Sequence, residues 1–261
     1  MNKVDYALPV FSLRFLPIWK RNFLVWKKLA VASVLGNIAD PLITLIAFGY
    51  GLGSLLQNIN GIPYIHYLAS GSICMSIMMA SSFEALYSAF SRMHMQKTWD
   101  ALLNAPISLD DVVLAEMLWA AAKSTFSGIA IIGVMFVLGI GLHPHLALVL
   151  PLLFLIGMTF ASIGLVVNAL AQGYDFFTYY FTLVLTPMIF LSGVYYPTAQ
   201  LPTWLQAVSQ FLPLSAAVNL VRPLILGDWP DAPVTYLSIL LAYCLSGFYV
   251  ATVLTRRRLL K

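Results

Sequence analysis

Charged residues are scarce in this chain of 261 residues. Asp, Glu, Lys and Arg together make up 9% of the sequence, whereas hydrophobic residues make up 61%. Soluble domains carry roughly a quarter charged residues. Because long apolar stretches fill almost the whole length, no soluble catalytic domain of ordinary size, about 100 residues or more, fits beside them. We therefore expect residues 1–261 to form one integral membrane domain.

The residues and motifs of many catalytic and metal sites are also few or absent. Both cysteines, Cys74 and Cys244, lie inside apolar runs, which argues against a disulfide framework and a CxxC metal site. Among the four histidines only His143 and His145 lie close together, and no third metal ligand stands nearby. The sequence contains no G-x-x-x-x-G-K-S/T, H-E-x-x-H or G-x-S-x-G motif. We expect no metal and no cofactor in this chain, and no ATP hydrolysis by a P-loop of its own.

Six apolar runs of about 20 residues predict an all-α protein with six membrane-spanning helices. The runs cover residues 30–56, 64–91, 112–140, 146–171, 177–196 and 234–255. All Lys and Arg residues except Lys123 and Arg222 fall on one side of this arrangement. Because basic residues near the ends of spans stay in the cytoplasm, both termini are predicted to be cytoplasmic. The net charge of +4 reflects this bias rather than nucleic-acid binding.

Residues 10–29 are predicted to form an interfacial amphipathic helix rather than a span. Its basic residues are Arg14, Lys20, Arg21, Lys27 and Lys28. At 100° per residue they occupy about 140° of the helix circumference. Aromatic residues lie on the opposite side, which suits rings at headgroup depth. This helix is either a membrane anchor or a charged face that docks a cytoplasmic partner. Because the apolar run that follows is too long for a signal-peptide core, we expect the N-terminus to be retained.

Polar side chains form stripes on the predicted spans. The residues that could line a hydrophilic path are Asn37, Asp40, Thr44, Ser81, Glu84, Ser88, Tyr179, Thr182 and Thr186. Counting the helical rise puts Asp40, Glu84 and Lys123 at roughly 10–17 Å from the cytoplasmic ends. Each charge at such a depth costs roughly 3 kcal/mol on insertion scales, so partners are expected. Either Lys123 neutralises one carboxylate and the stripes join helices, or the stripes form a path for a polar headgroup.

The fourth and fifth spans carry two further patterns. Small residues share one face of the fourth span and indicate close helix packing; they are Gly157, Ala161, Gly164 and Asn168. The polar face of the fifth span ends at Pro187, which frees a backbone carbonyl one turn earlier and predicts a kink.

Residues 197–233 are too broken by proline and too polar for a complete crossing. They contain two short apolar helices, expected over residues 203–211 and 215–226. Neither helix is long enough to span a membrane. We expect a re-entrant or surface hairpin on the outer side, with Trp204 and Trp229 as interface anchors.

The loop at residues 92–111 carries a short amphipathic helix that ends before Pro106. Its Trp99, Leu102 and Leu103 would fit a groove on a partner. Such insertion of apolar side chains is a common way for a helix to dock on another protein.

The order of these elements resembles the permease subunits of type-2 ABC exporters. Such permeases have an interfacial helix, six spans, a short helix between spans two and three, and a broken hairpin between spans five and six. Local sequences are similar to the nodulation protein J (NodJ) subfamily; they are Leu35–Pro41, Phe83–Tyr87, Lys97–Ala101, Gly173–Phe177, Thr186–Gly193 and Arg256–Leu260. The outer pattern of Leu201–Gln206, Phe211–Leu214 and Arg222 is similar to the wider exporter family.

The resemblance implies a transport subunit rather than an enzyme. It implies a homodimer in the bacterial inner membrane, paired with a separate, NodI-like ATP-binding cassette subunit that holds ATP and Mg. The coupling helix would then comprise Lys97, Thr98, Trp99, Asp100, Leu102 and Leu103. The charged face of the interfacial helix would add to the docking surface. The implied cargo is a lipo-oligosaccharide, or another lipid-linked glycan or amphiphile, moved outward; drug and polysaccharide exporters of the same family are alternatives.

Two other classes remain as weaker alternatives. An ion-coupled secondary transporter would use the same Asp40, Glu84 and Lys123, but the two matching repeats that such folds need are not visible. A membrane-embedded transferase would need a polar catalytic cluster at an interface, and the turn with His143 and His145 supplies no carboxylate.

Overall fold

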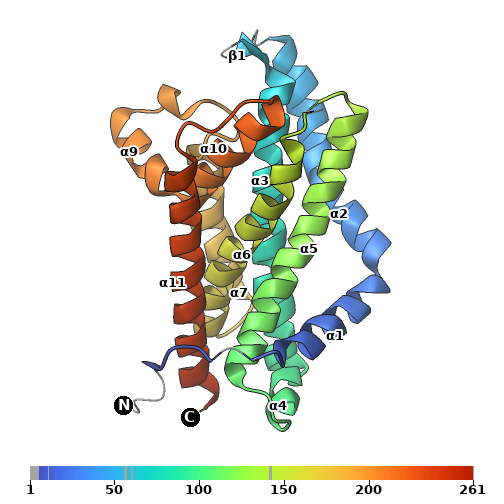
Figure 1. Ribbon diagram of the computed structural model, residues 1–261, viewed down its shortest axis with the longest axis vertical. Helices are drawn as coiled ribbons and strands as arrows, with labels where there is room; N and C mark the ends of the chain where they lie inside the picture. Colours follow the sequence, from blue (N-terminus) through green and yellow to red (C-terminus); the bar gives the residue numbers. More distant parts are fainter. Residues whose placement is uncertain (1–5, 11, 56–57, 60, 141–142, 261) are drawn as a thin grey trace.

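The computed structural model describes the chain except residues 1–5, 11, 56–57, 60, 141–142 and 261, and the side chains of residues 37, 38, 40 and 41. Helices dominate the described part (Figure 1). Four helical segments are long and apolar enough to cross a membrane: Tyr64–Met95, Leu109–Val137, Leu146–Leu170 and Pro233–Leu259. A bent pair of helices near the C-terminal third raises this number to five if the pair counts as one span.

The first of these segments is α3 (Tyr64–Phe83) with its π-helical extensions η4 (Glu84–Ser88) and η5 (Ser91–Met95). The others are α5 (Leu109–Val137), α6 (Leu146–Leu170) and α11 (Pro233–Leu259). α5 begins three residues before the predicted span, because Ser108 and Asp111 form a capping box. The Ser108 hydroxyl accepts from the Asp111 N–H, and the Asp111 carboxylate accepts from the Ser108 N–H.

The first and fifth predicted spans are less regular. α2 (Ala30–Ile46) continues into η2 (Ala47–Gly51) and η3 (Leu52–Ser54). α7 (Asp175–Tyr180), η6 (Phe181–Leu185) and α8 (Thr186–Leu191) follow one another directly. The apolar segments Leu42–Ser54 and Asp175–Leu191 are shorter than the four long ones. The six-span count therefore stays a prediction.

The irregular turn in the fifth segment lies directly before Pro187. Proline has no N–H to donate to the preceding turn, so that turn loses a regular hydrogen bond. The structure has a π-helix over Phe181–Leu185 at this place. The Thr186 hydroxyl donates to the Phe181 carbonyl at 3.0 Å, which satisfies one of the backbone acceptors there.

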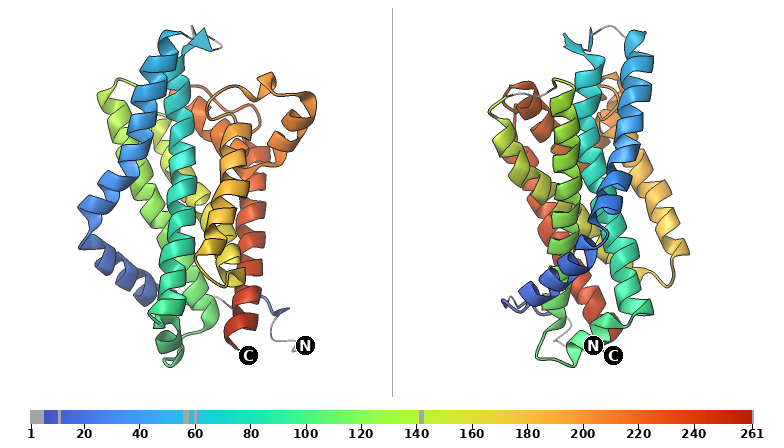
Figure 2. Two further views of the ribbon diagram at one scale, coloured as in Figure 1. Left: turned by 180° about the vertical axis from the view of Figure 1, so that it is seen from behind. Right: turned by 90° about the vertical axis from the view of Figure 1, so that its right-hand side faces the viewer.

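The two ends of the bundle differ in what they carry (Figure 1). One end holds α4 (Thr98–Leu103), the first described residues and the C-terminal end of α11. The other end holds α9 (Thr203–Phe211), α10 (Pro213–Leu226) and a small antiparallel hairpin of β1 (Asn58–Ile59) and β2 (Ile62–Pro63). Seen from behind, α3 runs between α2 and the α7–α8 segment (Figure 2).

The two helices predicted within residues 197–233 are present. α9 has the predicted bounds, and α10 begins two residues earlier than predicted, at Pro213. Proline fits the first turn of a helix because no N–H partner is needed there. The axes of the two helices differ by 83°. The re-entrant or surface position of this bent pair on the outer side stays a prediction.

α6 packs closely against its neighbours, as the small residues on its face predicted. A Cβ at Gly157 would lie 2.9 Å from Ala121 Cα of α5, and a Cβ at Gly164 would lie 2.9 Å from Ala85 Cβ. The Asn168 amide donates to the Ala85 carbonyl at 2.8 Å. Close approach of backbones through small residues is the usual basis of helix association in membranes.

Candidate functional site

A cavity of about 690 Å³ opens between α1 (Phe15–Lys27), the start of α2, the η4–η5 end of α3 and α5. Figure 1 shows α1 on the half of the bundle that holds α4, and lining residues come from α1 and from Thr98 of α4. Its charged lining residues are Arg21, Glu84, Arg92 and Lys123. Its aromatic lining residues are Trp26, Tyr87, Trp119 and Tyr174. The cavity is therefore a polar space with aromatic walls, built from several helices.

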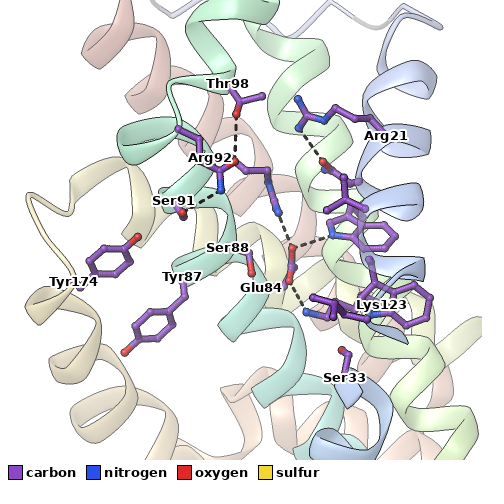
Figure 3. Close-up of a pocket in the computed structure, with 16 residues that line it drawn as sticks. Arg21, Ser33, Glu84, Tyr87, Ser88, Ser91, Arg92, Thr98, Lys123 and Tyr174 are labelled. Carbon is purple, nitrogen blue, oxygen red and sulfur yellow. Dashed lines mark hydrogen bonds and ion pairs between the residues drawn. The ribbon is translucent and has the colours of Figure 1, made fainter. Parts of the chain in front are cut away.

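Glu84 lies at the centre of the charged residues (Figure 3). Its Oε1 accepts from Arg92 Nη2 and from Trp119 Nε1, both at 2.9 Å, and its Oε2 accepts from Lys123 Nζ at 2.7 Å. Only 3% of the residue is exposed. The prediction that Lys123 neutralises a carboxylate is confirmed, and the partner is Glu84.

Glu116 forms a second centre on α5, and Arg92 joins it to Glu84. Arg92 Nε donates to Glu116 Oε1 at 2.9 Å, and Arg92 Nη2 lies 2.5 Å from Glu116 Oε2. Glu116 also accepts from Trp99 Nε1 at 3.3 Å and from the Asn22 amide at 3.4 Å. These partners come from α1, α3 with its extensions, and α4. One buried carboxylate thus connects four helices.

The aromatic side of α1 packs on α5. The rings of Trp19, Phe23 and Trp26 surround Trp119 at centroid distances of 6.2, 6.4 and 6.0 Å, each edge to face. Edge-to-face pairs are a favourable geometry for aromatic rings. These rings thus have a partner within the chain, and their predicted place at headgroup depth stays a prediction.

The basic residues of α1 and of its two cap positions, Arg14 and Lys28, have three different environments. Lys20, Lys27 and Lys28 are exposed, and the Arg14 guanidinium donates to the Pro106 carbonyl. Arg21 instead lines the cavity, and its guanidinium donates to Asn22 Oδ1 at 2.8 Å. The pKa of Arg21 lies below its usual value, because burial lowers the pKa more than the nearby Glu116 raises it. An arginine stays protonated under such conditions.

The segment of residues 97–103 is partly on the surface. Lys97 and Asp100 are exposed, and Thr98, Leu102 and Leu103 are half-buried. Trp99 is only 1% exposed, because its ring lies inside the chain and its N–H points to Glu116. The expectation that Trp99 enters a groove on a partner is therefore wrong for this conformation. A role of this segment in docking stays a prediction.

Two of the predicted path residues, Glu84 and Ser88, line the cavity together with Ser33 of α2. Ser81 is buried away from it, and its hydroxyl donates to the Ile77 carbonyl of its own helix at 2.7 Å. Donation to a carbonyl one turn earlier is the usual way to satisfy a buried serine in a helix. Of these residues, Glu84, Ser88 and Ser33 fit a common polar surface.

The remaining path residues do not join this surface in the described part of the chain. Thr44 is half-buried on α2 and does not line the cavity. Tyr179, Thr182 and Thr186 are exposed on α7, η6 and α8. The side chains of Asn37 and Asp40 lie outside the described part of the chain.

Sequence reasoning missed Arg92, Asn22 and Trp119 as members of this cluster. From the sequence, Arg92 indicates only the cytoplasmic end of the predicted span 64–91. Its spacing of eight residues from Glu84, about two helical turns, was the available signal. Asn22 was a second signal, since it is a polar residue next to the aromatic side of α1.

A separate buried ion pair, between Arg256 and Asp110, lies next to the first described residues and was also not predicted from the sequence. Arg256 Nε donates to Asp110 Oδ1 at 2.8 Å, and Arg256 Nη1 donates to the Ala7 carbonyl at 2.7 Å. The N–H of Val10 donates to Asp110 Oδ2 at 2.9 Å. These contacts hold the N-terminal segment against the start of α5 and the end of α11.

A second cavity, of about 700 Å³, lies at the opposite end of the bundle, next to Arg222 of α10. The Arg222 guanidinium stacks 3.7 Å above the Tyr67 ring and donates to the Ser70 hydroxyl at 3.1 Å and the Gly193 carbonyl at 2.7 Å. These contacts fix α10 on α3 and on the turn after α8, so Arg222 has a structural role.

The long apolar helices and the charged cavity at one end define a multi-pass α-helical membrane protein. Residues 14–226 match a family model described as "ABC-2 type transporter". The chain belongs to this family of membrane permeases, which makes it a transport subunit rather than an enzyme.

Three relatives cover nearly the whole chain. The nodulation protein J of Rhizobium leguminosarum bv. viciae is 45% identical over 256 residues, which cover 98% of each chain. The nodulation protein J of Rhizobium meliloti (strain 1021) is 42% identical over 254 residues and 97% of each chain. The inner membrane transport permease YadH of Escherichia coli (strain K12) is 24% identical over 241 residues, 92% of this chain and 93% of its own. The chain is thus a permease similar to nodulation protein J, as its sequence predicted.

Proposed function

We propose that this chain is the membrane subunit of an ATP-driven exporter in the bacterial inner membrane. It would move a lipo-oligosaccharide, or another lipid-linked glycan or amphiphile, outward. Membership of the ABC-2 type transporter family supports the transport role, and the full-length similarity to nodulation protein J proteins supports this cargo class. The name of the Escherichia coli relative supports the location.

The proposed topology has six spans with both termini in the cytoplasm. Four long apolar helices and two shorter apolar segments support six crossings. The end with α4 and the end of α11 carries the exposed basic residues of α1 and the arginines at 256–258. Because basic residues concentrate on the cytoplasmic side of membrane proteins, this end would face the cytoplasm.

Two partners complete the proposed machine. A second copy of this chain would form a homodimer, and a separate ATP-binding cassette subunit would hold ATP and Mg. The segment of residues 97–103 would contact that subunit through its exposed Lys97 and Asp100. The exposed Lys20, Lys27 and Lys28 of α1 would add to the docking surface.

The observation that carries this proposal is the connection between α4 and the cavity. Trp99 of α4 donates to Glu116, and Arg92 links Glu116 to Glu84 on the cavity wall. A displacement of α4 would therefore pull on residues that line the cavity. Such a chain of hydrogen bonds and ion pairs is a physical route by which nucleotide-driven motion of a docked subunit would reach the cargo path.

The same ion pairs weigh against ion-coupled secondary transport. A coupling carboxylate must exchange its proton or ion during the cycle, whereas Glu84 accepts from two cations and an indole N–H. Exchange would require breaking two buried ion pairs, which is costly. Drugs and polysaccharides are the alternative cargoes of the same machine.

A test uses the complex in lipid nanodiscs. This chain, carrying a tag, is co-expressed with the ATP-binding protein encoded beside it. Co-purification and vanadate-sensitive ATPase activity that rises with an acylated oligosaccharide are the expected results. If other amphiphiles stimulated the ATPase activity more strongly, the proposed cargo class would be wrong while the exporter proposal would stand. If no nucleotide-binding subunit co-purified under mild detergents, the exporter proposal would fail.

The Trp99→Phe substitution tests the connection itself, since it removes the indole N–H and keeps an aromatic ring. The lost hydrogen bond to a carboxylate is worth about 1.5–3 kcal/mol. We expect ATPase activity to persist while export per ATP falls. The Trp204→Phe variant is the matched control, because Trp204 is 67% exposed on α9. Equal export per ATP in both variants would refute the connection.

A further inference from the structure

The cluster around the cavity carries more positive than negative charge. Arg21, Arg92 and Lys123 line the cavity as cations, and Glu84 lines it as an anion. Glu116, which pairs with Arg92 from behind, adds the second carboxylate. Among the described side chains, three cations stand against two carboxylates, which leaves one positive charge. A charge that is partly removed from water without a counter-ion is unfavourable.

Within the described part of the chain, Arg21 is the lining cation that forms no ion pair of its own. Within the described residues, Arg92 and Lys123 form ion pairs, whereas the Arg21 side chain donates to the neutral amide of Asn22. Arg21 projects from α1 toward the space above Glu84 and Arg92 (Figure 3). The guanidinium offers five N–H donors in a fork that matches a phosphate or carboxylate. Its unused donors point to an anionic ligand.

The walls of the cavity fit an amphiphile better than a free ion. Val25, Trp26 and Leu29 line the side formed by α1. Tyr87 and Tyr174 line another side, with their rings stacked at 5.9 Å. A volume of about 690 Å³ lies within the usual range of about 300–1,000 Å³ for small-molecule sites. It holds a headgroup but not long acyl chains, which would extend along the apolar surface outside.

We propose that this cavity binds the phosphate of an anionic amphiphile, with the Arg21 guanidinium as its principal ligand. Basic pockets between membrane helices on the cytoplasmic side are typical sites for anionic headgroups. The cytoplasmic location rests on the topology in the proposed function. The phosphate has two possible sources: a resident phospholipid such as phosphatidylglycerol, or a phosphorylated headgroup of the cargo. Binding balances the positive charge of the described residues and holds α1 against α3 and α5.

Native mass spectrometry of the purified complex, titrated with phosphatidylglycerol or phosphatidylcholine, tests the site without ATP or transport. Wild type should bind phosphatidylglycerol more tightly than phosphatidylcholine. The Arg21→Gln variant should lose about tenfold in affinity for phosphatidylglycerol, the effect of roughly one charge-assisted hydrogen bond. Affinity for phosphatidylcholine should not change. Because no transport is measured, failure of the exporter proposal would not affect this result.

The Lys20→Gln variant is the matched control, because it removes the same charge from an exposed neighbour on α1. We expect less than a twofold change. Equal losses in both variants would indicate diffuse surface attraction and overturn the proposal, as would equal binding of the two lipids by wild type. The Arg21→Lys variant keeps the charge without the fork and should lose less than Arg21→Gln. It keeps the test valid if Arg21→Gln does not fold.

Two competition experiments separate the possible sources of the phosphate. Displacement of bound phosphatidylglycerol by a phosphorylated lipid-linked glycan would identify the cargo as the source. Retention of phosphatidylglycerol while an acylated oligosaccharide stimulates the ATPase would identify a resident lipid. Both results support a phosphate site that depends on Arg21. Displacement by inorganic phosphate at equal concentration would overturn the requirement for an amphiphile.

Discussion

The contribution of the Glu84–Lys123 ion pair to stability can be measured by substituting each of its two partners. The Glu84→Gln substitution removes the carboxylate that accepts from Lys123, Arg92 and Trp119. Lys123 then loses its ion pair, whereas Arg92 keeps Glu116. Removing one partner of a buried ion pair costs about 3–5 kcal/mol. We expect a loss of about 3 kcal/mol in the free energy of unfolding, since Gln retains the shape and one acceptor.

The Lys123→Met substitution should cost less, about 1 kcal/mol. The Lys123 side chain is 18% exposed, so water screens its pair, and Glu84 keeps Arg92 and Trp119 as donors. The double variant should lose less than the sum of the single losses, by about 1–2 kcal/mol, because residues in one network couple.

Steric trapping of the purified protein in bicelles measures these free energies at equilibrium. Wild type, both single variants and the double variant complete the cycle. The reasoning would be refuted if the Lys123→Met variant were less stable than the Glu84→Gln variant, or if the two losses were simply additive. Additivity would mean that the 2.7 Å contact between Lys123 Nζ and Glu84 Oε2 carries no energy of its own.

Two further predictions concern packing and the N-terminal segment. The Gly157→Ala substitution should destabilise by about 1–3 kcal/mol in the same assay, because its Cβ would meet Ala121 at 2.9 Å; the Gly133→Ala control, which meets nothing within 4 Å, should not destabilise. The Asp110→Asn substitution weakens the pair with Arg256 and the contact with the Val10 N–H, so limited proteolysis should cleave within the first 14 residues several times faster than in wild type. Unchanged cleavage would show that Asp110 does not hold this segment.

Hydrophobic length and proline positions were enough to predict most helices. α9 begins and ends at the predicted residues because proline precedes Thr203 and follows Phe211 closely. Helix starts such as Ser108 are also local signals, since a capping box needs only four residues. The first and fifth spans were harder, because π-helical and 3₁₀ turns interrupt them and leave no clear trace in hydropathy.

The candidate site was predictable only in part. The depth estimate brought Glu84 and Lys123 to one level, and they pair. It could not choose between Asp40 and Glu84 as the partner, because both carboxylates had similar depth. The burial of Trp99 against Glu116 was not predictable from the sequence. It depends on how the segment with Trp99 folds back on α5, where Glu116 lies 17 residues further along the chain. An amphipathic pattern indicates that Trp99 is covered, but not whether its own chain or a partner covers it.

The buried contact between Trp99 and Glu116 bears on how α4 would influence transport. The Glu116 carboxylate accepts from Arg92, Trp99 and Asn22, so a displacement of α4 would act on a group that also binds α1 and the extension of α3. A rearrangement driven at α4 would therefore reach Arg21 through Asn22 and reach Glu84 through Arg92. Both residues line the cavity, and Arg21 is the proposed ligand of the phosphate. Docking and headgroup binding would then be reciprocal: a ligand that holds Arg21 in place should also bias the position of α4, by the same free energy with which α4 biases the ligand.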